Sequence, residues 1–134
     1  LKAAGVTPGK RKSRSWQLLW GAADVEARTR LGDAAGARAT YEQVVKPFTL
    51  LLPGRGIELI ATECEARVRL AEGDAAGAKA LVGPGLKDIR LGPGARAQLY
   101  AIVGACEAKL GDADAAAAAN AKAHELAPHC AVLS

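Results

Sequence analysis

Apolar residues recur along the chain at intervals of three and four, which is the spacing of one face of an α-helix. Four segments show such a stripe, and each predicts an amphipathic helix that buries it: Trp16, Leu19, Trp20, Ala23, Ala27 and Leu31; Ala37, Tyr41, Val44, Val45 and Phe48; Ile57, Ile60, Ala61, Cys64 and Val68; and Leu99, Ile102, Val103, Cys106 and Leu110. A last helix is expected over roughly Ala113 to Leu126, where alanine is too frequent for a buried face to be assigned.

A Gly-Asp pair stands between successive helical segments and repeats three times, at Gly32-Asp33, Gly73-Asp74 and Gly111-Asp112. Glycine adopts a positive φ and so closes one helix. Aspartate then caps the next helix by accepting hydrogen bonds from its free amides. So short a connection makes the two helices antiparallel. The repeat therefore predicts three helical hairpins, which stack because none buries its apolar face alone.

Proline and glycine suggest where the hairpins end. Pro47 and Pro53 are expected to end the first hairpin, and Gly83-Pro84-Gly85 to end or kink the second helix of the middle one, leaving as few as two turns. Residues 86–91 leave open a further helical turn, and a new helix is expected after Gly92-Pro93-Gly94. The predicted hairpins cover about 16–48, 57–91 and 95–127, within a repeat domain over 15–134 that follows a flexible basic arm over 1–14.

Composition supports an all-α fold. Half of the 134 residues are hydrophobic, 31 are alanine and only 4% are aromatic, which favours thin, closely packed helices over a sheet. No apolar run reaches the length of a membrane span, so no membrane partner is expected. The three cysteines indicate reduced thiols and a cytoplasmic setting. The absence of methionine indicates a piece or processed product of a longer protein.

The net charge of +4 is concentrated at the N-terminus, where residues 1–23 carry five bases and no acid. The dense charge run from Lys10 to Ser15 is interpreted first as a solvated linker. Contact with phosphates, an anionic membrane or acidic protein, and modification at Ser13 or Ser15, stay open. The remainder is nearly neutral, so nucleic-acid binding is not favoured.

The third hairpin resembles the tetratricopeptide repeat, a helix–turn–helix unit with small or aromatic residues at set places. The resemblance rests on Tyr100, Gly104, Ala116, Ala123 and Pro128 around the third Gly-Asp turn. The first hairpin matches at its turn and at Ala37 and Tyr41 but lacks the small glycine of the first helix, and the middle one matches through Ala78, with two extra residues before its turn. The resemblance implies a right-handed α-α superhelix of about three hairpins, which binds segments of other proteins in a groove and has no catalytic activity.

The resemblance also implies which residues line the groove. One first-helix position would hold Arg30, Arg67 and Lys109, allowing for the extra residues of the middle hairpin, and another would hold Glu26 and Glu63. A column of bases suits an acidic peptide or a C-terminal carboxylate. Two other interpretations stay open: bases complement helix dipoles, and each Glu–Arg pair is a solvated i,i+4 pair.

The sequence gives weaker support for a nucleotide site, a metal site or a reactive cysteine. The segment Gly5–Arg11 has one residue too few between its glycines, and arginine where a phosphate loop needs Ser or Thr. His124, His129 and Cys130 lack a fourth zinc ligand, and Cys64 and Cys106, each followed by Glu-Ala, are expected to be buried packing residues. No cofactor, metal or catalytic residue is predicted.

The predicted function is a protein-interaction or scaffolding module that binds an acidic protein or peptide. The alternative is a regulatory or dimerisation tail of a larger signalling kinase, transcription activator or peptidase, which leaves a homodimer open. Binding of nucleic acid through the basic arm is the third alternative.

Overall fold

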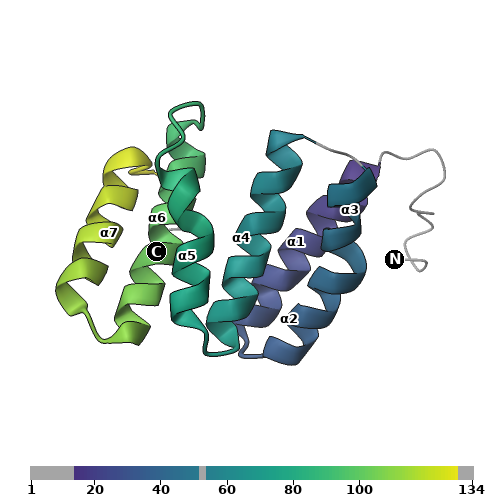
Figure 1. The fold of residues 1–134 in the computed structure, drawn as a ribbon, viewed down its shortest axis with the longest axis horizontal. Coiled ribbons are helices and arrows are strands. Elements are labelled where there is room, and N and C mark those ends of the chain that lie inside the picture. The colour runs from purple at the N-terminus through teal and green to yellow at the C-terminus, as the bar shows by residue number, and fades with distance from the viewer. Residues whose placement is uncertain (1–13, 52–53, 130–134) are drawn as a thin grey trace. The chain divides into compact units, whose positions relative to one another are not determined.

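The computed structural model describes residues 14–51 and 54–129, and every regular element in these ranges is helical (Figure 1). The predicted all-α class is therefore confirmed for this part of the chain. The order of elements is α1 (Arg14–Arg30), α2 (Ala34–Thr40), the π-helical segment η2 (Tyr41–Val45), α3 (Lys46–Leu51), α4 (Arg55–Ala71), α5 (Ala75–Leu86), α6 (Pro93–Leu110) and α7 (Ala113–Leu126). The chain divides within α4 into two compact units, one ending at Cys64 and one beginning at Glu65.

The three Gly-Asp turns share one backbone geometry, as predicted. Each glycine has a positive φ, with values of 81°, 93° and 89° at Gly32, Gly73 and Gly111. The N–H of the following aspartate donates to a carbonyl five residues earlier, at distances of 2.8–3.0 Å. This bond closes the helix in the manner of a Schellman motif, and only glycine adopts the left-handed conformation there without strain.

The aspartate of each pair caps the next helix, as the sequence predicts. In every hairpin its side-chain oxygen accepts a hydrogen bond of 2.9 Å from the backbone N–H three residues later, in the pairs Asp33 with Gly36, Asp74 with Gly77, and Asp112 with Ala115. One of the free amides at each helix start is thereby satisfied. Each Gly-Asp pair thus forms its turn and cap through contacts with residues close to it in the sequence.

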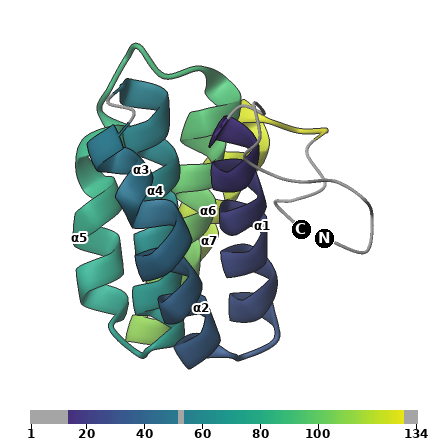
Figure 2. The ribbon, with the colours of Figure 1, turned by 90° about the vertical axis from the view of Figure 1, so that its right-hand side faces the viewer.

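In the first unit α1 packs against α2 and η2, and Figure 2 shows α1 and α2 side by side. Leu18 and Val25 of α1 are fully buried. The predicted stripe of the second helix is confirmed, since its members apart from half-buried Val44 lie in the core: Ala37, Tyr41, Val45 and Phe48.

The predicted buried face of the first helix is wrong. Trp16, Leu19, Trp20 and Leu31 are 40%, 59%, 42% and 84% exposed, and the alanines between them are exposed too. The opposite face of α1 is buried instead. The period was correctly recognised, but α1 carries apolar residues on both faces, and the wider stripe is the one left in solvent.

Pro47 does not end the first hairpin as expected, because α2, η2 and α3 follow one another without a break. The N–H of Lys46 donates to the carbonyl of Tyr41, five residues earlier. A proline ring in a helix clashes with the carbonyl four residues before it. The wider π-helical turn just before Pro47 gives that carbonyl room, so the helix continues to Leu51.

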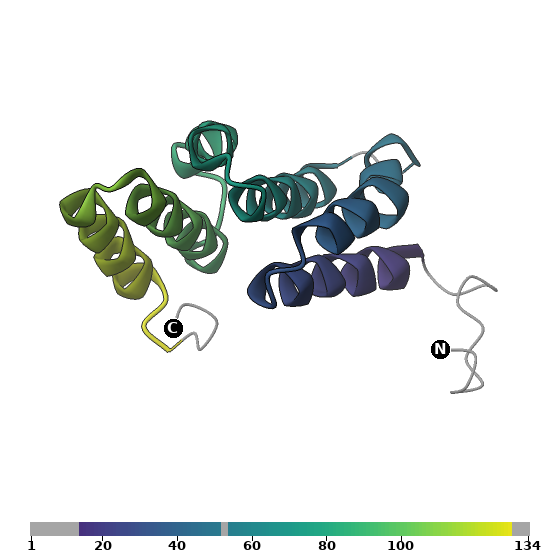
Figure 3. The ribbon, with the colours of Figure 1, turned by 90° about the horizontal axis from the view of Figure 1, so that it is seen from below.

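In the second unit α5 packs against α6 and α6 against α7, and Figure 3 shows the last two helices side by side. Val82, Leu99, Ile102 and Cys106 are buried between them. On α7 the buried residues are all alanines, at Ala116, Ala119 and Ala123.

The expected end of α5 near Pro84 is also wrong. The helix contains Pro84 and extends to Leu86, for 12 residues. A Cβ atom at Gly85 would come within 2.6 Å of Leu99 Cδ1, so the glycine lets α5 approach α6 closely and packing sustains the helix. The following residues, 87–91, form turns rather than a helix, and α6 begins at Pro93, two residues before its expected start.

The middle hairpin has no extra residues before its turn. Helices α1 and α4 are both 17 residues long. The N–H groups of Glu72, Gly73 and Asp74 donate to carbonyls four, three and five residues earlier, and the matching residues of the first hairpin do the same. Residues in the three hairpins are therefore matched by counting from the capping aspartate.

Candidate functional site

Arg30, the first of the predicted groove residues, forms a local ion pair. It lies at the end of α1, and its Nη2 is 2.8 Å from Glu26 Oε1. This is the i,i+4 pair that the spacing suggested as an alternative to a ligand site. An exposed pair of this kind contributes little to stability.

Arg67 and Lys109 lie in the second unit and differ in their surroundings. Arg67 Nη2 donates to Gln98 Oε1 at 3.2 Å, which links α4 to α6 and holds the guanidinium partly buried. Lys109 is exposed in the last turn of α6. Glu63, the other predicted acid, is half-buried on α4.

Counting from the capping aspartates changes the alignment of these residues. Arg30 and Lys109 each lie three residues before the aspartate of their hairpin. Arg67 lies seven residues before its own, the place that Glu26 holds in the first hairpin. The expected column allowed for two extra residues in the middle hairpin, but Arg67 lies four residues, or about one helical turn, from the register that Arg30 and Lys109 share.

A polar network that sequence reasoning missed joins α1 to α2. Asp24 Oδ2 accepts a hydrogen bond of 2.6 Å from the Thr40 hydroxyl and another of 2.7 Å from Arg28 Nε. Arg28 Nη1 donates in turn to Asp33 Oδ2 at 2.7 Å. Only the four-residue spacing of Asp24 and Arg28 was a signal in the sequence, because Thr40 lies sixteen residues from Asp24.

The network shifts the titration of its members. The Thr40 hydroxyl, and after it Arg28, lower the pKa of Asp24. The Gly36 amide, followed by Arg28, lowers the pKa of Asp33. Hydrogen bonds to a carboxylate favour its charged form. Both aspartates are therefore held ionised, in a structural role.

A second charged pair lies between α5 and α6. Lys79 Nζ contacts Glu107 Oε1, and Glu107 is only 7% exposed. The hydrogen bond and charge of Glu107 raise the pKa of Lys79. Neighbouring Cys106 is buried, and desolvation, with a smaller contribution from Glu107, raises the pKa of its thiol. A thiol of this kind is a poor nucleophile, in line with the packing role predicted for it.

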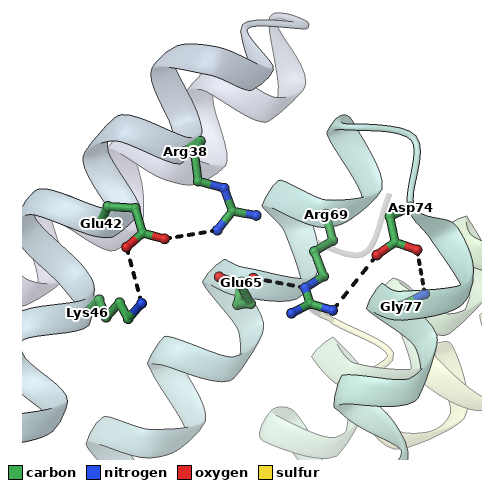
Figure 4. Close-up of polar contacts among 7 residues, drawn as sticks. All are labelled: Arg38, Glu42, Lys46, Glu65, Arg69, Asp74 and Gly77. Carbon is green, nitrogen blue, oxygen red and sulfur yellow. Dashed lines mark hydrogen bonds and ion pairs between the residues drawn. The ribbon is translucent and has the colours of Figure 1, made fainter.

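Figure 4 shows further ion pairs, in each of the two units. Glu42 accepts from both Arg38 and Lys46, at 3.2 and 3.3 Å, along one helical face of the first unit. In the second unit Arg69 lies 2.9 Å from Glu65 and 3.8 Å from the capping residue Asp74. These contacts are within each hairpin, and pairs of this type follow from helical spacing alone.

The histidine cluster and the Gly5–Arg11 segment, neither of which the sequence supports as a site, lie only partly within the described residues. Among residues 14–51 and 54–129 no three His, Cys, Asp or Glu side chains are grouped to hold a metal ion. His124 and His129 are exposed, and Cys130 lies outside the described residues, as do Gly5–Arg11 and the basic arm up to Ser13. None of the helices described is long and apolar enough to cross a membrane.

The largest feature that the sequence reasoning misassigned is the exposed apolar face of α1, which we call the α1 stripe: Trp16, Leu19, Trp20, Ala23, Ala27 and Leu31. An exposed apolar patch of several hundred Å² is typical of a surface that binds a partner. Its signal was present in the sequence, because Leu18 and Val25 form a second apolar face on the same helix. Comparisons with protein-family models, curated proteins and solved structures find no match to this chain.

Proposed function

We propose that this chain is a non-catalytic, cytoplasmic interaction module, built from hairpins of the tetratricopeptide-like type, that binds an acidic segment of another protein. The observation that carries the proposal is the threefold recurrence of one turn: a glycine with positive φ, a capping aspartate and the same closing hydrogen bonds. Repeated hairpins stack into extended surfaces that suit peptide recognition.

The chemistry of the partner follows from the bases at the ends of the first helices. Arg30 and Lys109 share a register, are exposed and lie in the last turn of their helices. Arg67, one turn away, is held by Gln98 in a fixed orientation. Guanidinium groups bind carboxylates through paired hydrogen bonds. An acidic segment or a C-terminal carboxylate is therefore the ligand we propose for these side chains.

A competition experiment tests this proposal. The intact chain and an Arg30→Ala/Arg67→Ala/Lys109→Ala variant are used to capture proteins from a lysate of the source cells, and an acidic peptide from any captured protein is titrated against both. A matched control replaces three bases elsewhere, Lys46, Arg90 and Lys122, and so removes the same charge.

We expect the peptide to bind the intact chain and the control, and to bind the triple variant at least about tenfold more weakly. An equal loss in the control would show attraction by net charge alone. Equal binding by all three chains would place the acidic ligand away from Arg30, Arg67 and Lys109 and contradict the proposed site.

A further inference from the structure

The α1 stripe makes α1 an unusual helix, because apolar residues line two opposite sides of it. Leu18 and Val25 are buried against the rest of the first unit, while the stripe on the opposite face is exposed. A helix at the surface of a folded domain normally turns its polar face to water. Helix α1 also carries charged residues, including Asp24, Glu26, Arg28 and Arg30, but the exposed stripe is an apolar surface on which a second packing partner fits.

We propose that this partner is α1 of a second copy of the chain, packed antiparallel on the α1 stripe in a two-fold symmetric dimer. The stripe contains no charged residue, so two copies bring no like charges together along its centre. A two-fold interface requires a surface that is complementary to itself. The distribution of large and small residues along the stripe meets that requirement.

Most of the large side chains of the stripe precede its small ones. Trp16, Leu19 and Trp20 fill its N-terminal half, and Ala23 and Ala27 follow them, with Leu31 at the C-terminal end. With the two-fold axis beside Ala23, Trp20 of one copy faces Ala27 of the partner subunit. Bulky side chains then fill the space left by small ones, which is the condition for close helix packing. A parallel pair would instead oppose tryptophan with tryptophan and alanine with alanine.

The exposed apolar area of the stripe matches the apolar part of a small dimer interface. The exposed parts of Trp16, Leu19, Trp20 and Leu31 amount to roughly 450 Å² in each copy, because tryptophan alone offers 150–250 Å² when fully buried. Two copies would bury about 900 Å² of apolar surface. Interfaces of standard size bury about 1,600 Å² in total, of which somewhat more than half is apolar. The stripe supplies that apolar share, and its polar neighbours supply the rim.

Arg30 lies at the rim of this interface, beside the stripe on α1 and paired with Glu26. In the antiparallel arrangement it comes near Trp16 of the partner subunit. A guanidinium over an indole ring is attracted by the electrons of the ring. Arg30 would then take part both in the dimer and in binding an acidic ligand. Arg67 and Lys109 belong only to the proposed acidic-ligand site, so their substitution separates the two kinds of binding.

Sedimentation equilibrium of the intact chain tests for the dimer, over protein concentrations from about 1 to 100 µM. Trp16 and Trp20 are the two tryptophans of the sequence, so their fluorescence reports on the stripe alone. We expect a mass that rises to twice that of the chain and a parallel shift of tryptophan emission to shorter wavelength. A monomer over the whole range would overturn the proposal and assign the stripe to another chain.

Two sets of variants locate the interface. Trp20→Glu should weaken the dimer at least about tenfold, whereas Ile89→Glu, which replaces another exposed apolar residue, should leave it unchanged. Trp20→Ala and Ala27→Trp should each weaken the dimer, and the double variant should recover it because the large and small partners are exchanged. Helical content by circular dichroism controls for folding. A dimer indifferent to Trp20→Glu, or a double variant no better than the single ones, would contradict this arrangement.

Discussion

Gly21 lies so close to Val44 that a Cβ atom at Gly21 would come within 2.7 Å of Val44 Cγ1. In the third hairpin the sizes at these two positions are reversed. Tyr100 and Ala123 are separated from their turn glycine by the same numbers of residues as Gly21 and Val44 are from theirs. A small residue on one helix is thus matched by a large one on the other, with the order reversed. The first helix does contain a close-packing glycine, one turn earlier than the family pattern places it.

Gly21→Leu should destabilise the chain by about 1–3 kcal/mol, because the β-branched side chains of Val44 and Val45 have little freedom to move away. The free energy of unfolding from urea denaturation measures the effect. Val44→Ala in the same chain should restore part of the loss. Gly83→Ala is the matched control: no atom lies within 4 Å of its added Cβ, so it should stabilise α5 by about 0.5–1 kcal/mol. Equal effects of Gly21→Leu and Gly83→Ala would contradict the close contact.

Gly104 gives a contrasting prediction for the third hairpin. It is buried, and its added Cβ would meet Asn120 Oδ1, the end of an exposed and movable side chain. Gly104→Ala should therefore be tolerated, whereas Gly104→Leu should cost about 1–3 kcal/mol because rotation of Asn120 cannot make enough room. Thermal and urea unfolding of both variants measure this difference. A leucine as well tolerated as alanine would disprove a tight helix contact at Gly104.

Tyr41→Ala should lower the free energy of unfolding by about 3 kcal/mol, since a buried aromatic ring is removed and a cavity remains. Part of the loss arises because Arg38, whose guanidinium carbon lies 5.7 Å from the ring centroid, loses its aromatic partner. Leu50→Ala, at an exposed position on α3, is the control and should change stability by less than about 0.5 kcal/mol. Similar losses in both variants would mean that Tyr41 is not part of the core.

Local chemistry explains which parts of the fold could be predicted from the sequence. A glycine followed by aspartate fixes its own turn through a positive φ and a side-chain cap, so all three hairpin turns were found. The continuation of helices through Pro47 and Pro84 depends on a π-helical turn and on packing of Gly85 against Leu99, neither of which a local rule contains. Periodicity also does not decide between two apolar faces, and on α1 it indicated the wrong one.

The candidate site was predictable in part, for a similar reason. Arg30 and Lys109 hold the same place relative to their turns, and the turns set the register. Arg67 was displaced by one helical turn because the longer interval between hairpins was assigned to the helix before the turn. The network of Asp24 with Thr40 joins residues from two helices, and no spacing rule connects them.

Asp112→Ala should destabilise the chain by about 1 kcal/mol, because the amide of Ala115 loses its hydrogen bond at the start of α7. Asp112→Asn keeps an acceptor oxygen at this place and should retain most of the stability. The measurement is the urea midpoint at constant m-value. Hydrogen exchange at Ala115 gives a local check, since its protection should fall in the alanine variant and persist in the asparagine one. Unchanged protection in both would show that the cap does not hold this amide.

Acid should weaken the first unit through Asp24 and Asp33, whose pKa values are both lowered in the fold. A group with a depressed folded pKa contributes stability above its unfolded pKa and loses that contribution as the pH falls toward the folded value. Unfolding midpoints should therefore be constant near neutral pH and decline from about pH 4 downward. Thr40→Val removes the hydroxyl that most lowers the Asp24 pKa, so that pKa should rise and the acid-dependent loss should become smaller. Titration of the Asp24 carboxyl carbon by NMR in the two proteins tests this directly, and an unchanged pKa in the valine variant would remove Thr40 as the cause.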